Sequence, residues 1–394
     1  MTVKKKSIFR NPALQALLVS LFCILLGLLV GFIALLIIKP ASAWEAITTI
    51  LKNFFKYNRQ NLQLKNLGNT LVKTAPLLMC SLSVLFAYKA GLFNIGAAGQ
   101  YVVGAGACLY CALAWHLPWY VCLVAAIVAG ALLGVISGAL KAYCNVNEVI
   151  SCIMLNWISL YTVNMLLAKV KETTSPYTFK LMSTSAASAI PTLDLGALLF
   201  GKNAYTGLAL ILAVVAAVLI WFILEKTRLG FELKATGFNR NAARYCGMKE
   251  KQNLILTMAI SGALAGCGAA LLYLTGFTEW STTQSSVPSM GFNGIAAAFL
   301  GGLSPIGSIF SSFFIQHITD GGAALTTMGL PAQISDLISS LIIYLCSFVM
   351  FFKLYFNNFL NRFEEKHGLL DTTNVNAEPA KAPVSEDKKG GTKE

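Results

Sequence analysis

Residues 90–140 read AGLFNIGAAGQYVVGAGACLYCALAWHLPWYVCLVAAIVAGALLGVISGAL and contain no Asp, Glu, Lys or Arg over 51 positions. A transmembrane helix needs about 20 consecutive apolar residues, so this stretch is too long for a single crossing of a bilayer. His116-Leu117-Pro118 lies near its middle, and proline ends one helix and suits the start of the next. The stretch therefore predicts two membrane spans joined by a tight connection.

Composition extends this prediction to the whole chain. Hydrophobic residues make up 56% and charged residues 12% of the 394 positions, and the charged share is about half that of a soluble domain. We therefore expect an all-α, polytopic membrane protein with about ten transmembrane helices. The apolar windows that predict them carry no charge apart from Lys73 and Asp336, and they are 13–38, 67–88, two in 90–140, 149–168, 203–224, 253–275, two in 280–319, and 333–352.

The first window is too long for a signal peptide. Residues 13–38 are uncharged over 26 positions, whereas the apolar core of a signal peptide has about 7–15 residues. We expect this window to be an uncleaved first span.

The charged segments between the windows predict the orientation. If the N-terminus is cytoplasmic, 20 basic residues lie on the cytoplasmic side and 10 outside, which follows the positive-inside rule. We expect residues 1–12 to be a cytoplasmic N-terminus and residues 13–353 to be the transmembrane domain. We expect residues 354–394 to be a largely disordered cytoplasmic tail, because they are too polar to bury a core. This orientation places the basic segment 39–66 outside.

The longest polar segment between two spans is residues 225–252, EKTRLGFELKATGFNRNAARYCGMKEKQ. It has seven basic and three acidic residues, and the orientation above places it in the cytoplasm. Asn239 suits the N-cap of a short helix over 241–246, and Gly247 suits the C-terminal end of that helix. An ordered basic loop of this kind indicates a docking site for another molecule.

Two similar glycine-rich segments indicate an internal repeat. GLFNIGAAG (91–99) follows the second span, and GFNGIAAA (291–298) follows the seventh. Five spans separate them, an odd number, so the two copies run in opposite directions. We therefore predict an inverted repeat of spans 2–5 and 7–10. Such pairs of glycine-interrupted segments indicate a transport path near the middle of the membrane.

Motifs for catalysis are absent from the sequence. It has no GxxxxGK[ST] or HExxH sequence and no cluster of carboxylates, so we expect no catalytic site and no metal site. Ionisable residues are scarce within the predicted spans, whereas an ion-coupled carrier places them near mid-span. This scarcity favours an external energy source. The alternatives from other classes are an ion-coupled secondary carrier and a membrane enzyme that acts on a lipid-linked substrate.

Neutral polar side chains occur within the spans, several of them beside aromatic rings. Amides that donate and accept hydrogen bonds, next to flat rings, suit an uncharged polar ligand such as a nucleoside or a sugar. The alternative interpretation is hydrogen bonding between helices, which contributes about 1 kcal/mol or less for each residue. The candidates for the substrate path are Phe93, Asn94, Gln100, Asn156, Trp157, Phe292 and Asn293.

Four separated motifs resemble one known family. They are GLFNIGAAGQ (91–100), NEVISCIMLNWI (147–158), ATGFNRNAARYCGM (235–248) and GFNGIAAAFLGGLSPIG (291–307). Together they resemble the membrane subunits (permeases) of bacterial nucleoside and simple-sugar ABC importers, in the superfamily that includes branched-chain amino acid permeases. The first two look most like the nucleoside branch, and Ala98 is a departure from it, since that branch more often has an acidic residue there.

This resemblance implies an ATP-driven importer of nucleosides in the bacterial plasma membrane, with both termini cytoplasmic. The implied partners are two ATP-binding subunits, a second homologous permease and an extracytoplasmic substrate-binding lipoprotein, with no role for nucleic acid. ATP and Mg would bind to the partner subunits, so this chain needs no cofactor. The alternative substrate is a simple sugar of the ribose or galactose type, or another small metabolite.

The resemblance also assigns a role to part of residues 225–252. Residues 235–247 resemble the coupling helix that docks into the ATP-binding subunit. The residues that match its pattern are Gly237, Asn239, Ala242, Ala243, Arg244 and Gly247.

Overall fold

The computed structural model of the chain describes residues 12–349, 351–355 and 358. The chain divides into two units, Met1–Met350 and Phe351–Glu394, and the fold below is that of the first unit. The predictions for residues 1–12 and 354–394 fall almost entirely outside the described residues and stay predictions.

Within the described residues the secondary structure is helical, apart from two isolated β-bridges. The α-helices, in chain order, are α1 (Pro12–Ile38), α2 (Ala43–Lys52), α3 (Gln60–Lys89), α4 (Ala97–Leu113), α5 (Trp119–Cys144), α6 (Glu148–Leu167), α7 (Leu181–Thr184), α8 (Leu195–Leu199), α9 (Leu208–Lys226), α10 (Arg228–Phe238), α11 (Arg240–Tyr245), α12 (Glu250–Tyr273), α13 (Met290–Leu300), α14 (Pro305–Ala323) and α15 (Ala332–Cys346). The 3-10 helices are η2 (Pro40–Ser42), η3 (Asn53–Lys56), η4 (Ala168–Val170), η5 (Ala186–Ser188) and η6 (Ala324–Met328).

Each predicted span corresponds to one of these helices, so the prediction of an all-α, polytopic membrane protein is confirmed. Among the described residues, seven helical segments are long and apolar enough to cross a membrane. The predicted break at His116-Leu117-Pro118 is also confirmed, because α5 begins directly after Pro118. The two spans predicted within 280–319 are separated before Pro305, where α14 begins with the hydroxyl of Ser304 as its N-cap.

Helix α13 is shorter than a complete span. It has 11 residues, which at 1.5 Å per residue make a length of about 16 Å, roughly half of the hydrocarbon core. The preceding residues 281–289 are not helical. The eighth predicted span is therefore a half-helix preceded by an irregular segment.

The packing of the helices supports the predicted inverted repeat, which relates α3 to α12, α4 to α13, α5 to α14 and α6 to α15. Helix α12 packs on α4 and α5, and α3 packs on their counterparts α13 and α14. Helices α3 and α12 also pack on each other. The packing of α12 on α4 and α5 therefore matches the packing of α3 on α13 and α14.

Small residues allow α5 and α12 to approach closely. A Cβ added at Gly130 would collide with the carbonyl oxygen of Gly262, and one added at Gly266 would collide with that of Ala126. Glycines four residues apart in membrane helices serve this close packing. The result fixes α12 as a central helix of the first unit.

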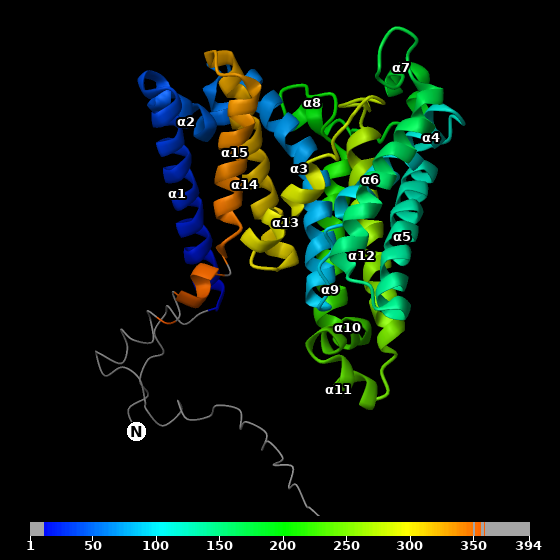
Figure 1. The fold of residues 1–394 in the computed structure, drawn as a ribbon. Coiled ribbons are helices and arrows are strands. Elements are labelled where there is room, and N and C mark those ends of the chain that lie inside the picture. The colour runs from blue at the N-terminus through cyan, green and yellow to red at the C-terminus, as the bar shows by residue number, and fades with distance from the viewer. Residues whose placement is uncertain (1–11, 350, 356–357, 359–394) are drawn as a thin grey trace, which may run out of the picture. The chain divides into compact units, whose positions relative to one another are not determined.

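The connections lie at two ends of the helices. Helices α10 and α11 project from the end at which α9 finishes and α12 begins, whereas α2, α7 and α8 lie at the opposite end (Figure 1). Two separate surfaces are thus available for contacts outside the membrane.

Candidate functional site

Residues 227–247 form a two-helix arm, which we call the α10–α11 arm. The hydroxyl of Thr227 caps α10 by accepting from the backbone N–H of Gly230 at 3.2 Å. The side-chain oxygen of Asn239 caps α11 by accepting from the N–H of Ala242 at 3.0 Å. Gly247 follows α11 with φ +80°, a conformation that favours glycine. The predicted cap and the predicted glycine end are confirmed, and α10 is a helix that the sequence analysis did not predict.

Two aromatic side chains extend from this arm. Phe238, the last residue of α10, is 95% exposed, and Tyr245, the last residue of α11, is 92% exposed. Ala242 and Arg244 are also exposed, whereas Ala243 is buried and anchors α11. Aromatic side chains are enriched at protein interfaces.

The inner side of the arm contacts the connection between α3 and α4. A Cβ added at Gly237 would lie 2.6 Å from the backbone nitrogen of Gly91, which has φ +73°. The side-chain amide of Asn253, on α12, donates to the hydroxyl of Thr236 at 2.9 Å. Gly237 therefore lies at the root of the arm, and the arm is joined directly to both central helices.

Just beyond this contact lies a buried polar cluster centred on Asn94. The Asn94 Nδ2 lies 2.8 Å from Gln100 Oε1, 2.6 Å from Ser261 Oγ and 3.3 Å from Ser83 Oγ. Asn94 and Gln100 are fully buried. The cluster joins the start of α4 to α3 and α12.

Asn156 makes a similar link from α6. Its Oδ1 accepts from the N–H of Gly99 at 2.8 Å, and its Nδ2 donates to the carbonyl oxygen of Ile95 at 3.2 Å. Asn94, Gln100 and Asn156 thus have partners within the chain. This geometry agrees with hydrogen bonding between helices, the alternative interpretation given above.

The other candidates for the substrate path lie on more accessible surfaces. Trp157 is 43% exposed and stacks on Tyr161, and Phe292 is 41% exposed. Phe93 and Asn293 are half-buried. No hydrogen bond among the described residues joins the Asn293 side chain to the Asn94 cluster, so the structure does not unite the two asparagines.

Sequence reasoning missed one charged pair within the helices. Lys73 Nζ, on α3, lies 2.8 Å from Asp320 Oδ1, on α14. The available signal was weak: Lys73 lies within the predicted span 67–88, and Asp320 directly follows the window 280–319.

Comparison with known proteins identifies the family. The pattern of the family described as branched-chain amino acid transport system / permease component matches residues 66–347. The chain is 34% identical over 332 residues to the guanosine ABC transporter permease protein NupP of Bacillus subtilis, covering 82% of this chain and 91% of that protein.

Two further relatives cover similar shares. The nucleoside ABC transporter permease protein NupB of Lactococcus lactis is 32% identical, over 84% of this chain and 90% of its own length. The glucose ABC transporter permease protein TsgB13 of Haloferax volcanii is 30% identical, over 84% and 86%. These matches span well over half of the chain, and the protein belongs to the branched-chain amino acid transport system permease family, as a permease component of an ABC transporter.

Proposed function

We propose that this permease forms the translocation path of an ATP-driven importer of nucleosides in the bacterial plasma membrane. The observation that carries the proposal is the α10–α11 arm, which has two exposed aromatic side chains outside and a backbone contact with Gly91 inside. The names of two relatives at 34% and 32% identity support nucleosides as the substrate class.

The partners would be two ATP-binding subunits, a second homologous permease and an extracytoplasmic lipoprotein that delivers the substrate. ATP and Mg would bind to the ATP-binding subunits, and no covalent chemistry takes place on this chain. Among the described residues, no group of three or more His, Cys, Asp or Glu is arranged to hold a metal ion.

The arm would transmit movement through two connections. An ATP-binding subunit that closes on Phe238 and Tyr245 moves α10, and Gly237 then pushes on the connection between α3 and α4. The hydrogen bond between Thr236 and Asn253 carries the same movement to α12. Helix α3 packs on α13 and α14 of the second half, and α12 packs on α4 and α5 of the first half. Movement of α3 and α12 would therefore shift the two halves relative to each other and change access to the path from one side to the other.

Replacing Phe238 and Tyr245 together with serine is expected to detach the ATP-binding subunits. An aromatic anchor at a protein interface contributes about 2 kcal/mol, so losing two weakens binding by roughly a thousandfold. The measurement is co-purification of the ATP-binding subunits with the permease. Trp44→Ser is the control, because Trp44 is 72% exposed on α2, at the opposite end of the helices. Equal recovery of the ATP-binding subunits with the wild type, the double variant and Trp44→Ser would contradict the docking role.

Uptake of radiolabelled guanosine or uridine by cells that lack this permease tests the substrate class. We expect the wild-type gene to restore uptake, ATP depletion to stop it, and an uncoupler to leave it intact while ATP is maintained. Uptake that collapses with the uncoupler and survives ATP depletion would indicate an ion-coupled carrier instead.

A simple sugar is the second candidate substrate, because the glucose permease relative covers as much of the chain as the nucleoside permeases do. Competition separates the two. Unlabelled ribose or glucose that blocks uptake better than unlabelled uridine would favour a sugar.

A further inference from the structure

A polar pocket opens between η3, α3 and α14, near the end of the helices opposite the α10–α11 arm. Its volume is about 630 Å³. Pockets of about 300–1,000 Å³ hold small molecules. The lining residues that matter here are Asn53, Tyr57, Asn66, Asn69, Lys73 and Phe277.

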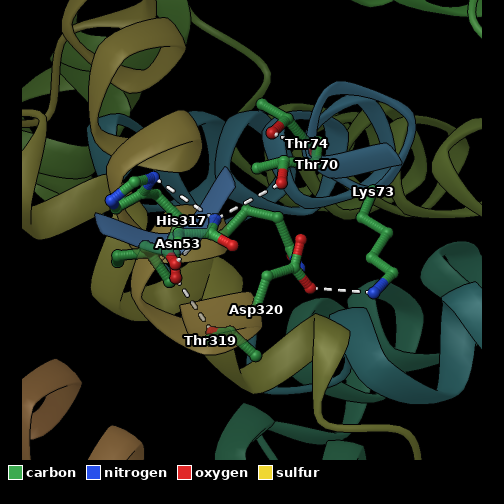
Figure 2. Close-up of polar contacts among 9 residues, drawn as sticks. Asn53, Thr70, Lys73, Thr74, His317, Thr319 and Asp320 are labelled. Atoms are coloured by element: carbon green, nitrogen blue, oxygen red, sulfur yellow. Dashed lines mark hydrogen bonds and ion pairs between the residues drawn. The ribbon is translucent and has the colours of Figure 1, made fainter. Parts of the chain in front are cut away.

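The floor of this pocket is an ion pair between the two halves of the protein. Lys73 Nζ donates to Asp320 Oδ1 at 2.8 Å (Figure 2). Gln316 Nε2 donates to the same oxygen at 3.0 Å. Lys73 Nζ also lies 5.6 Å from the centre of the Phe277 ring. The two charges balance each other, so the floor requires no charged ligand.

One wall is held in place by hydrogen bonds around Asn53. Its Nδ2 lies 3.2 Å from the carbonyl oxygen of His317, 3.3 Å from His317 Nδ1 and 3.5 Å from Thr70 Oγ1 (Figure 2). The ring of His317 is fixed in turn by a contact of 2.9 Å with the carbonyl oxygen of Leu51. Asn53 has φ +38°, which is rare for a residue with a side chain and which these contacts stabilise.

Three amide groups in the pocket remain available to a ligand. The Nδ2 atoms of Asn53 and Asn66 donate within the chain, and the Oδ1 of Asn69 accepts from Asn203 at 2.8 Å. The other polar atom of each amide has no hydrogen-bond partner among the described residues. These atoms are Oδ1 of Asn53, Oδ1 of Asn66 and Nδ2 of Asn69. These three amides therefore offer two acceptors and one donor, and the ammonium group of Lys56, which also lines the pocket, donates to Thr327 Oγ1 at 3.1 Å.

Two aromatic rings complete the pocket. Phe277 lies between α12 and α13 in sequence and is held edge-on by Tyr205 at 5.3 Å, and Tyr57 is exposed at the rim. Neutral amides together with a ring suit a ligand that has hydroxyl groups, ring nitrogens and a flat face. Stacking on an aromatic side chain is a general way to bind any nucleobase.

We infer that this pocket binds an uncharged nucleoside before it passes between the two halves of the protein. The inference rests on the proposed function, because it takes the substrate class from it. The pocket joins α3 of the first half to α14 of the second, so a ligand there contacts both halves. It also lies apart from the Asn94 cluster, whose amides already have partners within the chain.

Substrate protection against labelling tests the inference in the complete importer complex. Asn66→Cys places a thiol in the pocket, and Asn61→Cys, on the same helix, places an exposed thiol outside it. Cys144 and Cys246 are the natural cysteines classed as exposed in the described residues, and both are replaced with serine to lower the background. A maleimide that does not cross membranes is the label.

We expect uridine or guanosine at ten times its dissociation constant to slow labelling of the Asn66→Cys complex about tenfold. Labelling of the Asn61→Cys complex should not change. Equal rates with and without nucleoside would overturn the inference, and so would protection by ribose alone or by the substrate-free lipoprotein alone.

A Phe277→Leu variant gives a second readout. It keeps an apolar side chain and removes the ring, so the KM for nucleoside uptake should rise about tenfold while the ATP-binding subunits still co-purify. An unchanged KM would overturn the role of the ring. Nucleoside uptake by the wild-type complex separates the failure of this inference from the failure of the proposed function. If the wild-type complex takes up nucleosides, but nucleoside does not slow labelling and Phe277→Leu does not raise the KM, the pocket assignment fails and the proposed function stands.

Discussion

Replacing Gly237 with valine is expected to reduce transport by about tenfold or more and to leave the protein in the membrane. A Cβ at this position would lie 2.6 Å from the backbone nitrogen of Gly91 and 2.7 Å from the carbonyl oxygen of Ala90. Backbone atoms have no rotamer that relieves the overlap. The arm must therefore shift away from the connection between α3 and α4, at a cost of about 1–3 kcal/mol.

The shift breaks the connection through which the arm moves the central helices. Nucleoside uptake should fall by about tenfold or more, since 1.4 kcal/mol corresponds to about a factor of ten. The measurement is uptake per ATP hydrolysed by the complete complex.

Gly329→Asn is the control for this variant. Gly329 lies outside the arm, the nearest atom to a Cβ added there is Lys39 Nζ at 4.0 Å, and asparagine tolerates its φ of +72°. We expect this variant to transport close to the wild-type rate. Wild-type coupling in the Gly237→Val complex would show that the contact with Gly91 transmits no movement.

Replacing Asn94 with leucine is expected to destabilise the protein strongly. The change removes the donor that serves Gln100 Oε1 and Ser261 Oγ in a fully buried site. Ser261 Oγ keeps its bond to the carbonyl oxygen of Ser83 at 2.7 Å, so Gln100 Oε1 is the buried group that loses its donor, at a cost of about 1–3 kcal/mol. The apparent melting temperature of the purified permease in detergent should fall by about 1–4 °C.

Asn293→Leu is the comparison for Asn94→Leu, because the two asparagines occupy similar motifs. The side chain of Asn293 is half-buried and makes no hydrogen bond among the described residues. We expect this variant to melt near the wild-type temperature, so that any change in its KM reports on the substrate path. An Asn94→Leu protein with wild-type stability and a raised KM would instead place Asn94 in that path.

Much of the fold was predictable because a bilayer imposes simple demands on sequence. A helix that crosses hydrocarbon must satisfy its own backbone and carry few charges, so charge-free windows locate the spans. Pro118 and Pro305 end and start helices through their own covalent geometry. Asn239 and Gly247 act over a few residues, which is why the boundaries of α11 were predicted to within one residue.

The candidate site was less predictable because its contacts join distant parts of the chain. Lys73 and Asp320 are 247 positions apart, and Asn94 and Ser261 are 167 apart. The sequence around each of these residues shows that a polar residue is present in an apolar segment, and it does not show which residue is its partner. The amides of Asn94 and Asn156 serve helix packing, whereas those of Asn53, Asn66 and Asn69 line a pocket.

The sequence by itself determined the membrane spans, the breaks between them and the caps of α11, since each depends on hydropathy or on local backbone geometry. Only the tertiary structure decided that Gly237 contacts Gly91, that Asn94 is enclosed and that Lys73 pairs with Asp320. Those three facts depend on which helices pack together, and packing is settled by side chains far apart in the sequence.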